Sequence, residues 1–192
     1  VVTVSAKLPI NNLKELIDTS GVVLELRRKL YGNEHPAVAE SLNNLALVLR
    51  SEGRLSEAEK LHRDALAMDL KLFGHDHLAV ATSLNNLGLA LEANEEPAAA
   101  EQCFRESLAI QKKLLGDDQP GLAITLDNLA FVLREEGKLE EADAIIADIP
   151  VTQSTLEGAA VFRTLGEWNA LQGRWKDASK RFSLLLRVGI LE

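Results

Sequence analysis

Apolar residues recur along this chain at the three- and four-residue spacing of an amphipathic helix. One such stripe lies between Pro36 and Gly53, and a second runs from about Leu55 to Gly74. Proline suits the first turn of a helix, and glycine accepts the left-handed conformation that commonly ends one. The segment 33–74 is therefore predicted to be two helices joined by a tight turn.

This two-helix pattern returns with a period of 42 residues. Ser41-Leu42-Asn43-Asn44-Leu45-Ala46 recurs as Ser83-Leu84-Asn85-Asn86-Leu87-Gly88 and as Thr125-Leu126-Asp127-Asn128-Leu129-Ala130. A fixed period of this length is typical of a solenoid, in which each unit buries its apolar face against the next. We expect repeats over 33–74, 75–116 and 117–150, the last with a short second helix because Pro150 stops it.

The two ends of the chain depart from the period. Segment 13–32 aligns with the second helix of a repeat and is expected to be a second helix without its partner. Segment 1–12 is left open as an arm or a truncated repeat. Segment 151–192 is expected to be a fourth repeat. The whole is an all-α fold of about nine helices, read as a fragment of a longer protein because it starts at Val1 rather than Met.

Composition argues against several classes of function. The net charge of -8 disfavours nucleic-acid binding, which needs a basic surface. No apolar run reaches the roughly 18 residues of a membrane span, and no signal-peptide pattern is present. Cys103 is the only cysteine, so no internal disulfide can form, which is consistent with a cytoplasmic protein.

The sequence shows no motif of an enzyme. We find no Gly-rich phosphate loop, nucleophile elbow or kinase signature. His75 and His77 could suggest a metal site, but no further ligand pattern accompanies them, and His77 takes the place of His35 in a repeat turn. We therefore expect no catalytic residue, metal or cofactor.

A further set of residues carries a resemblance to a known family. Near the C-terminus these are Phe162, Leu165, Gly166, Asn169, Gly173, Trp175, Ala178 and Phe182. Their spacing resembles the tetratricopeptide repeat (TPR), and the resemblance extends over roughly residues 13–190. The 42-residue variant, with His35-Pro36 and Glu57-Ala58-Glu59, is similar to the repeats of kinesin light chains. The shorter last unit looks more like a bacterial repeat region.

The resemblance implies a right-handed α-α superhelix in which the first helix of each pair lines a concave groove. The implied lining positions are Glu40, Asn43, Leu47, Arg50, Thr82, Asn85, Leu89, Glu92, Ile124, Asp127, Phe131, Arg134, Arg163 and Glu167. Amides at Asn43 and Asn85 would hold an extended peptide backbone, although a plain solvated surface stays open for both. Their neighbours Asn44, Asn86 and Asn128 are expected to make hydrogen bonds between helices.

Among the remaining groove positions, the apolar and the basic side chains would bind different parts of a ligand. Leu47, Leu89 and Phe131 would form apolar pockets, and Arg50, Arg134 and Arg163 would take carboxylates. The sequence thus predicts a scaffold that binds a peptide segment of a partner protein. Two alternatives stay open: self-association through the repeat ends as a homodimer, or an intramolecular regulatory module of a larger enzyme such as a Ser/Thr kinase.

Overall fold

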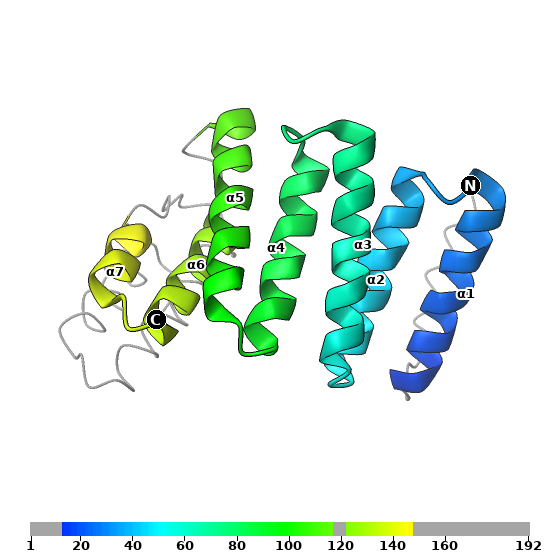
Figure 1. Cartoon of the computed structure of the whole chain (residues 1–192), viewed down its shortest axis with the longest axis horizontal. Helices are drawn as coiled ribbons and strands as arrows, with labels where there is room; N and C mark the ends of the chain where they lie inside the picture. The colour runs from blue at the N-terminus through cyan, green and yellow to red at the C-terminus, as the bar shows by residue number, and fades with distance from the viewer. Residues whose placement is uncertain (1–12, 117–121, 148–192) are drawn as a thin grey trace, which may run out of the picture. The chain divides into compact units, whose positions relative to one another are not determined.

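The computed structural model describes residues 13–116 and 122–147 (Figure 1). Within these ranges the chain forms seven helices and no strand, which confirms the all-α class. The helices are α1 (Leu13–Tyr31), α2 (Pro36–Ser51), α3 (Leu55–Phe73), α4 (Leu78–Ala93), α5 (Pro97–Leu115), α6 (Leu122–Glu135) and α7 (Leu139–Ala147). The expected arm at 1–12 and the expected repeat at 151–192 lie outside the described residues.

The described helices belong to two compact units, α1–α4 and α5–α7. In the first unit each helix packs against the next in sequence, and α4 also touches α2 (Figure 1). In the second unit α5 packs on α6, and α6 packs on α7. No helix in the described part of the chain has the long apolar stretch that crossing a membrane would require.

The turn between repeats is built by a histidine cap. His35 and His77 precede α2 and α4 in extended backbone, and the Nδ1 atom of each accepts a hydrogen bond of 3.1 Å from the amide two residues later. Each imidazole also stacks on the aromatic ring that ends the preceding helix, with centroids 4.4 Å apart at Tyr31 and 4.1 Å apart at Phe73. The structure thus uses His77 as a helix cap.

Small side chains let the helix pairs approach closely. Ala58 of α3 is fully buried, and it packs in one cluster with Ala46 and Leu49 of α2. The residues one and two periods later, Ala100 and Ala142, are also fully buried. The repeat therefore reserves this position for a methyl group, as close helix packing requires.

A larger side chain at Ala58 should overpack the α2–α3 pair. We expect Ala58→Leu to lower the free energy of unfolding by about 1–3 kcal/mol, measured by urea denaturation. Ala67→Leu is the matched control, because Ala67 is exposed on the same helix, and it should stay within about 0.5 kcal/mol of wild type. Equal losses in the two variants would contradict the packing described for Ala58.

Candidate functional site

An open pocket of about 250 Å³ lies on the first unit, between α2 and α4. It is lined by Pro36, Glu40, Asn43 and Asn44 of α2, Asp69 and Phe73 of α3, and Ala79, Thr82 and Asn86 of α4. Of the positions predicted for a groove, Glu40, Asn43 and Thr82 therefore come together here. Asp69, Phe73 and the amide of Asn86 were not predicted as site residues from the repeat pattern.

A chain of buried hydrogen bonds runs behind this pocket. The Asn43 Nδ2 donates to the Ser83 Oγ at 2.8 Å, and the Ser83 hydroxyl donates to the Asp69 Oδ2 at 2.6 Å. The Asn43 Oδ1 lies 2.8 Å from the His62 Nδ1. Because an amide oxygen can only accept, the proton of the imidazole is on Nδ1. The chain joins α2, α3 and α4 through side chains that are nearly or fully buried.

Asn43 therefore departs from its expected role. Its amide is buried and engaged on both sides, so it is not the exposed rung that the repeat pattern suggested. Asn44, expected to bridge helices, is instead exposed and lines both this pocket and a smaller one of about 170 Å³ against α1. Neither Asn44 nor Asn86 forms a side-chain hydrogen bond within the described residues. These two amides are available to a ligand.

His62 is at the opposite end of this series of hydrogen bonds from Asp69. It is fully buried, in the position that Phe104 and Ile146 fill in the following two periods. Burial and, to a smaller extent, the nearby positive charge of Arg50 together lower its pKa to about 4. The imidazole is thus neutral at pH 7.

The remaining predicted positions of the first unit are partly accessible. Leu47 and Arg50 of α2 are half-buried, as are Asn85, Leu89 and Glu92 of α4. The Arg50 guanidinium makes no ion pair with another described residue, so its charge is available to an anionic group.

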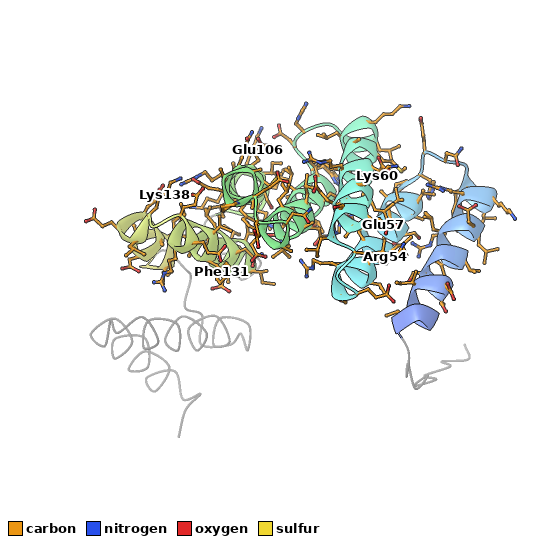
Figure 2. The ribbon with its side chains drawn as sticks, turned by 60° about the horizontal axis from the view of Figure 1, so that its bottom comes forward. Arg54, Glu57, Lys60, Glu106, Phe131 and Lys138 are labelled. Atoms are coloured by element: carbon orange, nitrogen blue, oxygen red, sulfur yellow. The ribbon has the colours of Figure 1, made fainter. Side chains whose placement is uncertain are left out.

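The second unit presents the same positions on α6. Ile124 is 48% exposed and Phe131 is 36% exposed, so both apolar side chains reach solvent. Phe131 is labelled in Figure 2. Arg134 was expected in the groove, but its side chain is only 1% exposed and its Nη2 lies 2.6 Å from the Asp143 Oδ1. The interhelix ion pair with α7 explains this burial. Arg163 and Glu167 lie outside the described residues.

Asp127 stands one and two periods after Asn85 and Asn43, in the same helix position. It is half-buried, and burial raises the pKa of its carboxyl to about 6, while the charge of Arg134 opposes this rise. At neutral pH the ionised Asp127 therefore destabilises the folded protein, and a neutral amide at this position should be more favourable.

The two adjacent asparagines of α2 give a direct test of the helix register. Asn43→Ala should lower the free energy of unfolding by about 1–3 kcal/mol, because it leaves the buried His62 N–H without an acceptor. Asn44→Ala is the matched control and should change it by no more than about 0.5 kcal/mol. Urea denaturation of both variants at pH 7.5 measures the difference. A larger loss for Asn44→Ala would contradict the hydrogen-bond chain.

Asp127→Asn should stabilise the protein in a pH-dependent way. The pKa of Asp127 is higher in the folded chain than the roughly 3.9 of an unfolded aspartate, so its contribution to stability is lost as the pH rises through 6. The gain from Asn should thus be near zero at pH 4 and reach about 2 kcal/mol at pH 7.5.

Urea denaturation of wild type and Asp127→Asn at pH 4, 5.5 and 7.5 measures this gain. The exposed Asp64→Asn on α3 controls for the loss of one negative charge. A gain for Asp127→Asn that is the same at all three pH values would show that the Asp127 carboxyl does not titrate as described.

Comparison with solved structures places the fold among known helical repeats. Two structures of nearly identical TPR-like repeats from Podosopora anserina, described as a kinesin light chain, align with TM-scores of 0.76 and 0.75 at 20% identity. These alignments cover 92% of this chain and 86% and 87% of the others. BtubC (BKLC) from P. vanneervenii aligns with a TM-score of 0.67 at 17% identity, over 92% of this chain and 80% of its own.

Sequence comparison gives the family. A search of curated proteins found no match. The profile of the tetratricopeptide repeat matches residues 23–71, 43–113 and 80–146, which together extend over more than half of the 192 residues. On this evidence the chain belongs to the tetratricopeptide repeat family.

Proposed function

We propose that this chain is a protein-interaction scaffold that binds an extended segment of a partner protein along the accessible faces of α2 and α4. Tetratricopeptide repeats in general mediate contacts between proteins, and the proposal specifies the surface and the kind of ligand. The observation that carries it is the open pocket between α2 and α4, which is lined by Asn44 and Asn86, two residues without a side-chain hydrogen bond to any other described residue.

Amide side chains suit an extended peptide. Each offers two N–H donors and a carbonyl acceptor, so Asn44 and Asn86 can bond the main-chain groups of a strand-like segment whatever its sequence. Leu47 and Leu89 lie about one turn farther along the same faces of α2 and α4, and both are half-buried. They supply apolar contacts for the partner's side chains.

Charge along α2 adds a direction to this surface. Glu40 lies near the start of the helix, where it is exposed and pairs with Arg27 of α1 at 3.1 Å. The guanidinium of Arg50, which has no ion pair among the described residues, lies near its end. A bound segment with separated positive and negative side chains would contact both. The proposal therefore favours a partner of mixed charge, in one preferred orientation.

A specific observation favours self-association as a second candidate. Val22, Leu26 and Leu30 form one stripe on α1 at four-residue spacing, and they are 58%, 59% and 71% exposed. An exposed apolar stripe of this kind is typical of an interaction surface. It lies on α1, away from the lining of the pocket between α2 and α4.

Panning of a random-peptide display library tests the groove. The wild-type chain should enrich a shared motif, and the double variant Asn44→Ala, Asn86→Ala should lose it because the backbone contacts are removed. The matched control removes two exposed amides elsewhere, Asn33→Ala and Gln102→Ala, and should keep the motif.

Two results would contradict peptide binding in the groove. One is a motif that survives in the groove variant. The other is a lack of enrichment by the folded wild type, together with a dimer in sedimentation that Leu26→Glu dissociates, and this would favour self-association.

A further inference from the structure

We propose that the pocket between α2 and α4 receives a cationic side chain, lysine or arginine, of the bound segment. The inference rests on the proposed function and names the chemistry that one subsite of the groove selects. It comes from three features of the pocket: its charges, its shape, and its difference from the matching positions in the neighbouring repeats.

The pocket is acidic. Of its nine lining residues two are carboxylates, Glu40 and Asp69, and none is basic. Glu40 has a side chain that is 63% exposed and pairs with Arg27 of α1, whose Nη1 lies 3.1 Å from the Glu40 Oε2, whereas Asp69 is only 4% exposed. One carboxylate thus lies in solvent and the other lies deeper, which suits a long side chain that carries its charge at the tip.

Among the described residues, the deep carboxylate of Asp69 has no ion-pair partner. The hydrogen bond that Asp69 accepts comes from the neutral hydroxyl of Ser83. Burial raises the pKa of Asp69, and the Ser83 bond and the influence of His77 only oppose that rise. The imidazole of His77 is already engaged as a helix cap and stacks on Phe73. An ammonium or guanidinium group in the pocket would supply the missing positive charge.

The walls of the pocket match the rest of such a side chain. Pro36, Phe73 and Ala79 offer apolar surface to the methylene stem, which lysine and arginine commonly bury along apolar residues. The amide oxygens of Asn44 and Asn86 can accept hydrogen bonds from the charged head. A volume of about 250 Å³ is below the roughly 300–1,000 Å³ of small-molecule sites, and it suits one side chain.

Helix packing does not require an acidic residue at the position of Asp69. One period earlier the same position holds Arg27, and one period later it holds Gln111. The hydroxyl opposite is kept as Ser41, Ser83 and Thr125, and Arg27 donates to the Ser41 Oγ at 3.0 Å. Three different side chains therefore fit the same place. The negative charge of Asp69 is a local feature of this pocket.

Titration of the ¹⁵N-labelled chain with single amino-acid derivatives tests the proposal. The probes are the N-acetyl amides of lysine and arginine, with those of norleucine and glutamate as uncharged and anionic comparisons, in 150 mM NaCl. The two cationic probes should shift the amide signals of Asn44, Phe73, Thr82 and Asn86 with millimolar affinity, and the other two should not.

Variants assign the charges. Asp69→Asn should weaken the cationic probes about tenfold or more, and Glu40→Gln, at the exposed edge, about two- to fivefold. Glu106→Gln is the matched control, since it removes one exposed carboxylate from α5 in the other unit (Figure 2), and it should bind as wild type does. The amide spectrum shows whether each variant is folded. If Asp69→Asn does not fold, Glu40→Gln still tests the pocket.

Three outcomes would overturn the inference. They are the absence of localised shifts with the cationic probes, equal shifts with norleucine, and shifts that CaCl₂ reproduces at lower concentration, which would indicate a metal site. None of these bears on whether display panning enriches a peptide motif, so the peptide-binding function and its cationic subsite fail separately.

Discussion

The first unit depends on the fact that α3 must bury polar as well as apolar side chains between α2 and α4. His62 and Asp69 of α3 are both almost wholly inaccessible, and an unpaired polar group in that position would cost about 1–3 kcal/mol. Asn43 and Ser83, one from each neighbouring helix, supply the partners. This chain of bonds fixes how α2 and α4 are rotated against α3, and thereby which side chains are left on the accessible face.

The accessible face follows from that rotation. With the amide of Asn43 turned inward, the next residue along α2 points to solvent, and the pocket acquires the free amides of Asn44 and Asn86. The same rotation puts the deeper carboxylate, Asp69, among the lining residues. Asn43, which is part of the core, and Asn44, which is proposed to bind a partner, are adjacent on one helix, so substitutions at Asn43 and Asn44 are expected to act on different properties.

Most of the fold could be predicted from the sequence because its signals are local. Pro36 and Pro97 begin helices, Gly74 and Gly116 follow the ends of helices with positive φ, and the segment Leu13–Tyr31 is one helix as its alignment with 55–73 suggested. Such caps and periodic stripes depend on a few neighbouring residues.

The candidate site was harder to predict because it depends on tertiary contacts. Successive helical residues differ by about 100° around the axis, and Asn43 and Asn44 both lie at the edge of the apolar stripe, where periodicity does not separate core from surface. Arg134 is an arginine that the stripe places near solvent, but an ion pair with Asp143 of α7 buries it. Asp69 is polar and isolated in the sequence pattern, and only the tertiary fold places it in the pocket between α2 and α4.

The central claim is that Asn43 belongs to the core whereas Asn44 and Asn86 are free to bind. Hydrogen exchange of the asparagine side-chain amides, followed by ¹⁵N NMR, tests it most directly. The account predicts that the Nδ2 protons of Asn43 exchange slowly, because they are buried and one is bonded to Ser83, and that those of Asn44 and Asn86 exchange at rates close to those of a free amide. Slow exchange at Asn44 and fast exchange at Asn43 would contradict it.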